Sequence, residues 1–407
     1  MPRSGDERDD ARMGKRIQGF RKARGWTQHG LAQRAHISYS TITKIETGAM
    51  PVSPTVQAAC ARALRVHITD ITGQPYVDNL RGDQLDELVQ PVRLAVANPF
   101  HVTATGIPPR PVREIRSDID RLDALRVHGR GAEIGPHIPA LIDELLHAVS
   151  MLPPGRDQEL AYRLLASSYR LAYIFAHRLG YPEVGLMALE RQDFAAARSG
   201  DPYLKGVITH CRSNFFLYHG AFDIGLAGID AMTREVDTAA GAADPHAMSM
   251  LGSLHLKAAV LHSRRRVPGA AQTAEDHVRE AAVLAARLPA DFDPYGLVFD
   301  TTNVRLHRVS VRLDLGKVGE AIEDGEKVVF PEGWARHRVA HHHMDLARGY
   351  ERVRRPDKAL RSLVSARQAE PVQTRYHPTT HETVLALLSG RGKPSEELRR
   401  YARWVGV

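Results

Sequence analysis

The sequence predicts an all-α protein with a small helical domain at its N-terminus and a long array of paired helices behind it. Residues 26–48 read as two short helices joined by a tight turn. Residues 127–407 show no alternating strand pattern but contain a weak repeat of helix, turn and helix. Aromatic residues make up only 6% of the chain, and Ala, Leu and Arg are abundant, which favours helix over sheet.

The composition is that of a soluble protein with two or more domains. The chain has 407 residues, of which 43% are hydrophobic and 25% charged. Its two cysteines, Cys60 and Cys211, provide neither a disulfide framework nor a cysteine metal site. The polar residues 1–10 do not resemble a signal peptide, and no apolar run reaches the roughly 18–20 residues of a membrane span. These features predict a cytoplasmic protein.

The N-terminal domain is expected to contain five helices, over residues 12–73, after a disordered segment at residues 1–11. The first helix, over 13–24, is amphipathic and ends at Gly25. Thr27 is expected to cap the second helix and Ser38 the third, which Gly48 ends. A fourth helix is expected over 56–64 and a short fifth over 66–71. The expected inner face of the middle helices comprises Leu31, Ala32, Ala35, Ile37, Ile42 and Ile45.

Positive charge is concentrated in this domain. Residues 11–75 carry ten Lys or Arg against two acidic residues, so their net charge of +8 equals that of the whole chain. Basicity gathered on a helix-turn-helix is typical of a surface that binds phosphates. The domain is therefore predicted to bind double-stranded DNA, which would bring the protein to the nucleoid.

Residues 12–73 resemble the lambda-repressor-like helix-turn-helix domains of the Xre type. The shared residues are Thr27-Gln28, Leu31-Ala32, Ser38, Ile42, Ile45-Glu46, Gly48 and Ala63-Leu64. The sequence departs from that family at His36, where the family usually has Gly. The alternative is a small helical bundle that binds protein instead of DNA.

This resemblance implies roles for individual residues. Gln28 is expected to hold a DNA phosphate through its side-chain amide and backbone N–H, while Tyr39, Ser40 and Lys44 face base edges. Glu46 is expected to tie the third helix to Arg16 or Arg21 of the first. Because one such motif reads few base pairs, the family binds palindromic operators as homodimers. The full set of expected DNA contacts is Arg21, Lys22, Arg24, Thr27, Gln28, Ser38, Tyr39, Ser40, Thr43 and Lys44.

Residues 74–126 are expected to form a helical linker with a proline-rich loop. A helix over 84–97 carries an apolar stripe that includes Pro91, a residue that can kink a helix. Residues 98–113 contain four prolines and no apolar periodicity, which predicts a loop. Helical spacing resumes at Ile115.

The repeat in residues 127–407 places Gly or Arg in a turn and a small residue five positions later, where a second helix begins. The copies are Gly180 to Gly185, Gly220 to Gly225, Arg266 to Ala271, Gly316 to Ala321, and Arg354 to Ala359. The last two copies, within residues 315–371, resemble tetratricopeptide repeats. The small residues recur every 38–50 positions, longer than the usual repeat of about 34, which predicts an irregular superhelix. A plain helical array is the alternative.

The combination of domains resembles actinobacterial regulators and, more distantly, the quorum-sensing regulators of the RRNPP type. That resemblance implies a groove that binds a peptide or small-molecule effector and controls DNA binding. The candidate ligand contacts are Asn214, Tyr218, Asn303 and His307; a solvated or capping role is the stronger expectation for each. A second functional class stays open, an interaction scaffold or antitoxin-like partner whose repeats bind another protein.

No enzyme, cofactor or metal site is predicted. His337, His341, His342 and His343 invite a metal interpretation, but consecutive histidines on a helix point about 100° apart and cannot chelate together, so only His337 and His341, four residues apart, could share a metal. They are expected to be surface histidines. Neither a phosphate-binding loop nor a zinc-protease or nucleophile-elbow motif is found in the sequence.

Overall fold

The computed structural model describes residues 6–35, 37–50, 52, 54–64, 66, 71, 82–98, 108–240, 244–265, 267–390 and 394–407. Every regular element in these ranges is helical, which confirms the predicted fold class. The elements are α1 (Asp6–Ala23), α2 (Gln28–Ala35), α3 (Tyr39–Glu46), α4 (Pro54–Leu64), α6 (Gly82–Ala97), α7 (Val112–Val127), η1 (Gly131–His137), α8 (Ile138–Met151), α9 (Arg156–Arg178), α10 (Pro182–Ala196), α11 (Leu204–Tyr218), α12 (Phe222–Ala240), α13 (Pro245–Arg264), α14 (Ala270–Ala285), α15 (Thr301–Asp314), α16 (Val318–Glu326), α17 (Arg336–Arg352), α18 (Pro356–Ala369), α19 (Pro371–Tyr376), α20 (Pro378–Leu388) and α21 (Glu396–Val405).

Helices α1–α4 form a small domain with its own core. Ile17 of α1 packs with Leu31 of α2 and Ile42 of α3, and all three are fully buried. The predicted caps are present, since Thr27 Oγ1 accepts from Gly30 N at 3.0 Å and Ser38 Oγ accepts from Thr41 N at 3.1 Å. Both caps satisfy backbone N–H groups that a helix start leaves without intrahelical partners.

Helix α1 begins at Asp6, which lies inside the segment 1–11 that was expected to be disordered. The expected position of His36 and most of the expected fifth helix lie outside the described residues, as does the core of the proline-rich loop.

Helix α6 runs through Pro91 as one helix. Val89 and Val92 on either side of the proline are fully buried, and they join the large core of the helical body. Burial of both neighbours anchors the helix on each side of the position where a backbone hydrogen bond is missing.

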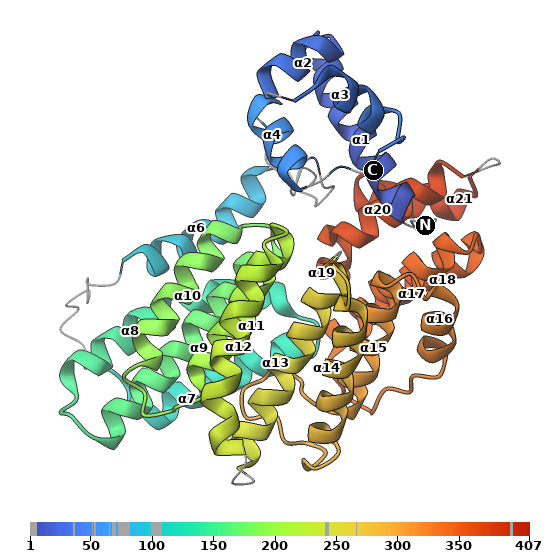
Figure 1. The fold of residues 1–407 in the computed structure, drawn as a ribbon. Coiled ribbons are helices and arrows are strands. Elements are labelled where there is room, and N and C mark those ends of the chain that lie inside the picture. The colour runs from blue at the N-terminus through green and yellow to red at the C-terminus, as the bar shows by residue number, and fades with distance from the viewer. Residues whose placement is uncertain are drawn as a thin grey trace.

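The body consists of helix pairs that pack side by side (Figure 1). Pairs α9–α10, α11–α12, α15–α16 and α17–α18 turn at the predicted residues: Gly180, Gly220, Gly316 and Arg354 have φ of 87°, 66°, 75° and 58°. A left-handed residue after a helix satisfies its last carbonyls and reverses the chain. The predicted repeat turns are therefore found at these four places.

The small residues of the repeat lie where paired helices approach each other. A Cβ atom on Gly185 of α10 would lie 3.3 Å from the ring of Tyr173 in α9, and Ala321 and Ala359 are fully buried. The third copy is corrected, because Ala271 is exposed and Ala270 and Ala274 are buried instead. The left-handed residue before α14 is Gly269 (φ 81°), which shifts the inward face of that helix.

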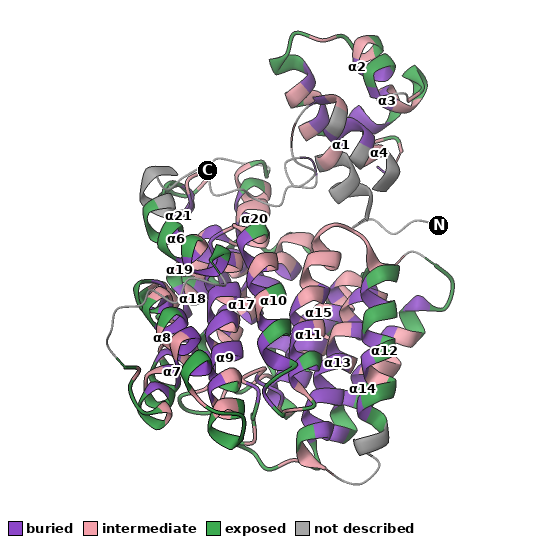
Figure 2. Cartoon of the chain, turned by 90° about the vertical axis from the view of Figure 1, so that its left-hand side faces the viewer, coloured by how far each residue is buried: buried purple, intermediate pink, exposed green. Residues whose placement is uncertain are grey.

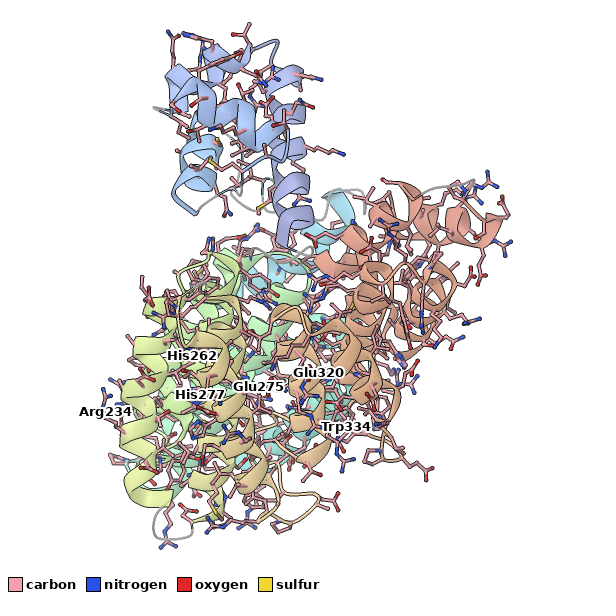
Figure 3. The ribbon with its side chains drawn as sticks, turned by 45° about the vertical axis from the view of Figure 1, so that its right-hand side comes forward. Arg234, His262, Glu275, His277, Glu320 and Trp334 are labelled. Atoms are coloured by element: carbon pink, nitrogen blue, oxygen red, sulfur yellow. The ribbon has the colours of Figure 1, made fainter. Side chains whose placement is uncertain are left out.

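Buried residues fill the interior between the helix pairs (Figure 2). The largest apolar cluster extends from Val89 in α6 to Tyr376 in α19. Polar contacts join neighbouring pairs on the outside: Lys317 Nζ lies 2.9 Å from Glu275 Oε1, and Trp334 Nε1 donates to Asp300 Oδ2 at 2.6 Å. Figure 3 labels Glu275 and Trp334 from these two contacts, together with Glu320 of α16.

The N-terminal domain stands on one end of the helical body, near α20 and α21 (Figures 1 and 2). None of the described helices is both long and apolar enough to cross a membrane.

Candidate DNA interface and effector cavity

The outer face of α3 presents polar side chains to solvent. Tyr39 is 52% exposed, and Ser38, Ser40 and Lys44 are also exposed. The ring of His29 in α2 lies 6.0 Å from that of Tyr39, measured between centroids, so the two helices form one continuous surface. Lys22 and Arg24 at the end of α1 are exposed as well. These side chains have the type and position of a phosphate- and base-contacting surface.

A buried carboxylate holds α3 against the other helices. Glu46 accepts two hydrogen bonds of 2.7 Å from the Arg21 guanidinium and one of 2.9 Å from Gln28 Nε2. Burial acts to raise the pKa of Glu46, but the bonds from Arg21 and Gln28 outweigh it and hold that pKa below its ordinary value. The hydrogen bond to Glu46 raises the pKa of Arg21. The expected tie to the first helix is therefore made by Arg21, while Arg16 donates instead to the Ile71 carbonyl at 2.9 Å.

This arrangement corrects one expected DNA contact, Arg21, and narrows the expected role of a second, Gln28. The side chain of Arg21 is only 9% exposed and also donates to the Trp26 carbonyl at 2.6 Å, so it is an internal group. The side-chain amide of Gln28 is engaged with Glu46 and with Thr43 Oγ1 at 3.3 Å. One N–H of the Gln28 side-chain amide is thus taken by Glu46, and the second amide N–H and the backbone N–H at the start of α2 remain as expected phosphate donors.

Two other expected contacts have structural roles in the domain. Thr43 is partly buried and donates to the Tyr39 carbonyl at 3.1 Å, and Thr27 caps α2. The exposed members of the expected set are Lys22, Arg24, Thr27, Ser38, Tyr39, Ser40 and Lys44.

The helical body has an open cavity of about 780 Å³. Side chains of α9, α11, α13, α15 and α17 line it, together with residues of α10, α14, α19 and α20 and with Met13 and Arg16 of α1. Cavities of this size hold small-molecule ligands in other proteins. The first helix of each predicted pair thus faces the cavity, and the N-terminal domain lies at its edge.

Two of the three acidic residues that line the cavity, Asp314 and Asp345, are paired with arginines. Asp314 lies 2.9 Å from Arg264 Nε and 2.9 Å from Arg348 Nη1, and Asp345 lies 3.2 Å from Arg348 Nη2. Burial acts to raise the pKa of Asp314, but the charges of Arg264 and Arg348 outweigh it and hold that pKa far below its ordinary value.

Lys257 and Arg338 have neutral partners instead. Lys257 Nζ donates to Asn214 Oδ1 at 2.7 Å, and Asn214 Nδ2 donates to the Tyr173 hydroxyl at 3.0 Å. Arg338 Nε donates to Asn303 Oδ1 at 2.8 Å, and its Nη2 lies 3.3 Å from His307 Nδ1. Burial lowers the pKa of Lys257 to about 8, and the charge of Arg338 acts in the same direction.

Three of the four candidate ligand contacts, Asn214, Tyr218 and His307, line the cavity. Asn303 does not line it; its amide donates to the Val298 carbonyl at 2.6 Å and its oxygen holds Arg338. Sequence reasoning missed Lys257 and Arg338. A sequence signal did exist for the lysine, which is the one charged residue in the apolar segment 247–261 of α13.

The expectation of surface histidines on α17 is corrected for His337 and His342, whereas His341 and His343 are half-buried. His337 and His342 are buried, and His341 and His342 line the cavity. Burial lowers the pKa of His337 and His341 well below the ordinary value and that of His342 to about 4. Among the described residues, no group of three or more His, Cys, Asp or Glu is arranged to hold a metal ion.

Comparison with known proteins agrees with the N-terminal fold. The profile of the helix-turn-helix domain family matches residues 12–71. A comparison with curated proteins finds no match. Among solved structures, PlcR of Bacillus thuringiensis in complex with the peptide PapR7 and DNA is 11% identical, with 93% of this chain and 100% of that chain covered and a TM-score of 0.26.

A second solved structure is the apo form of the competence regulator ComR from Streptococcus vestibularis. It is 12% identical, with 74% of this chain and 99% of that chain covered and a TM-score of 0.23. The family match, together with the capped and buried geometry of α1–α4, identifies residues 12–71 as a helix-turn-helix domain.

Proposed function

We propose that the chain is a sequence-specific DNA-binding transcription regulator. The observation that carries this proposal is the exposed face of α3, with Tyr39, Ser40 and Lys44, in a domain whose net charge equals that of the whole chain. Lysine and hydroxyl side chains on such a helix reach base edges in the major groove, and the surrounding positive charge attracts phosphates. The buried Glu46–Arg21 pair supports this role, because it fixes the orientation of α3 within the domain.

The regulator acts as a homodimer on a palindromic operator in this proposal. A single α3 covers only a few base pairs, and two copies related by a two-fold axis read two half-sites about one helical turn apart. The helical body is long enough to provide the contacts between the two copies, and operator footprinting would give the half-site spacing directly.

The cavity of the helical body is the proposed site for a peptide or small-molecule effector. Its lining includes Met13 and Arg16 of α1, so a bound molecule would contact the DNA-reading domain and the body together. A ligand shifts an equilibrium only through different contacts in two states. Contact with α1 gives the effector such a difference, because α1 carries Arg21 and so connects to α3.

The test uses the full-length protein and random-sequence duplexes, from which bound DNA is selected and sequenced to define the operator. The variant Tyr39→Ala/Lys44→Ala is expected to bind that operator at least about 30-fold more weakly, because each of the two base contacts is worth roughly 1–3 kcal/mol. Its circular dichroism should match the wild type, since both side chains are exposed.

Lys205→Ala is the matched control, because Lys205 is an exposed lysine of α11 in the helical body. It should leave operator affinity unchanged. Undiminished operator binding by the Tyr39→Ala/Lys44→Ala variant would refute the assignment of α3 as the reading helix.

A further inference from the structure

We propose that the cavity binds its ligand through an anionic group, a carboxylate or a phosphate, and that Lys257 and Arg338 are the cations that hold it. This inference concerns the same cavity as the proposed effector site. It rests on the proposed function only in that the bound molecule is taken to be a regulator. The recognition chemistry itself follows from the cavity wall.

The cavity wall carries a large excess of positive charge. Its lining includes eight Lys or Arg and three Asp or Glu, a formal excess of five positive charges. The two acids Asp314 and Asp345 are already engaged with Arg264 and Arg348. Arg265 is paired with Asp223, which lies outside the lining, but the lining itself still holds more cations than carboxylates, which favours an anionic occupant.

Lys257 and Arg338 are the clearest members of this excess. In the described part of the chain neither makes an ion pair, and the acceptors of Lys257 Nζ and Arg338 Nε are the side-chain oxygens of Asn214 and Asn303. Both side chains are half-buried, and even partial withdrawal of a cation from water without a counter-charge is costly, so such groups are seldom retained for stability alone. A ligand carboxylate or phosphate would supply the missing charge.

The two cations are also held in place before any ligand binds. Asn214, which accepts from Lys257, itself donates to the Tyr173 hydroxyl, and that hydroxyl donates to the Cys211 carbonyl at 3.0 Å. Asn303 is fixed by its bond to the Val298 carbonyl while it holds Arg338 Nε. Fixed donors lose little entropy on binding, which strengthens a charge-assisted contact.

The rest of the wall indicates what accompanies the anionic group. Phe215, Val260 and Leu306 line the same cavity, so the site combines a cationic region with apolar surface. The expected ligand is an organic anion with an apolar part, either a free acid or phosphate ester, or the terminal carboxylate of a short peptide.

The experiment uses two fluorescent probes with the full-length protein. 8-Anilinonaphthalene-1-sulfonate carries an anionic group, and N-phenyl-1-naphthylamine has the same aromatic frame without it. The sulfonate should bind about tenfold more weakly to Lys257→Met and to Arg338→Met, which corresponds to the loss of one charge-assisted contact. The neutral probe should bind all three proteins alike, and the exposed-lysine variant Lys205→Met should behave as wild type.

The conservative variants Lys257→Arg and Arg338→Lys keep the charge and should keep most of the selectivity for the sulfonate. They keep the test informative if a methionine variant fails to fold. Equal binding of the sulfonate to the wild type and both methionine variants overturns the proposal, as does an equal loss of both probes. Operator binding is measured separately, so intact DNA binding without anion selectivity would overturn this inference and leave the proposed function standing.

Competition against the sulfonate distinguishes the sources of the anion. Displacement by decanoate or decyl phosphate, but not by decanol, indicates a small acid or phosphate ester. Displacement by N-acetyl-trileucine, but not by its C-terminal amide, indicates a peptide terminus. If decanol or the peptide amide displaces the sulfonate as effectively as the acids do, the proposal is overturned.

Discussion

The carboxylate of Glu46 is the residue on which the geometry of the DNA-reading domain most depends. Replacing it by Gln leaves the Arg21 guanidinium buried without a counter-charge, and breaking such a pair costs about 3 kcal/mol. We expect Glu46→Gln to lower the free energy of unfolding of the N-terminal domain by that amount. Hydrogen exchange at the amides of α1–α3 would measure the loss.

Glu323→Gln is the control for this prediction, because Glu323 pairs with Lys327 at 2.6 Å on the exposed face of α16. Exposed pairs of this kind contribute little, so no measurable change is expected. Exchange rates in α1–α3 that are unchanged in Glu46→Gln would show that the pair does not stabilise the domain.

The same residues show how far the reading surface was predictable. The spacing of Thr27, Ser38 and Gly48 predicted both helices and their caps, because capping depends on local hydrogen bonds. Whether Arg21 faces DNA or Glu46 depends on its rotation about α1 and on a contact 25 residues away. A sequence pattern does not resolve that choice among neighbouring basic residues.

At the scale of elements, close approach between helices depends on residues without a side chain. A Cβ atom on Gly252 of α13 would lie 1.9 Å from the ring of Phe299, which is itself buried. We expect Gly252→Ala to lower the free energy of unfolding by about 1–3 kcal/mol through overpacking. Urea denaturation followed by circular dichroism would measure this change.

The matched control is Gly228→Ala, in α12. Gly228 is exposed and a Cβ atom there would meet nothing within 4 Å. Alanine in an open helix position should stabilise the protein by about 0.5–1 kcal/mol. Opposite signs for the two variants are the expected result, and a loss of stability in both would mean that helix packing is not what distinguishes them.

The helix pairs were predictable where a turn and a small residue kept their spacing. Gly180 and Gly316 end their helices in the left-handed conformation that such a turn requires. In the third copy the left-handed residue is Gly269, directly before α14, and the buried small residues are Ala270 and Ala274 in place of Ala271. A longer turn changes which face of the next helix is buried, and residue spacing alone does not report turn length.

At the scale of the molecule, the cavity could not have been predicted from the sequence. Lys257 and Arg338 lie 81 positions apart and meet only because successive helix pairs curve around one space. The side chains predicted to face a groove, Asn214, Tyr218 and His307, were found on its wall because they lie on the first helices of pairs. Periodicity indicates a helix face, whereas the neighbours of that face depend on the whole stack.

Buried and half-buried histidines of the helical body make the stability of the whole protein depend on pH. Burial is the main cause that lowers the pKa of five of them well below the ordinary value; these are His210, His307, His337, His341 and His377. In the unfolded chain histidine takes up a proton near pH 6.5, so between that pH and the lower folded pKa the unfolded state binds more protons. Stability is therefore complete above about pH 6.5 and falls as the pH drops below it.

Each such histidine should cost about 1.4 kcal/mol of unfolding free energy for each pH unit below 6.5. Urea denaturation at pH 7.5, 6.5 and 5.5 would measure the slope, and His307→Gln should reduce it by about the contribution of one proton. The exposed His128, which follows α7, gives the control variant His128→Gln, expected to leave the slope unchanged. A slope that is the same in His307→Gln and wild type would mean that His307 is as readily protonated in the folded protein as in the unfolded chain.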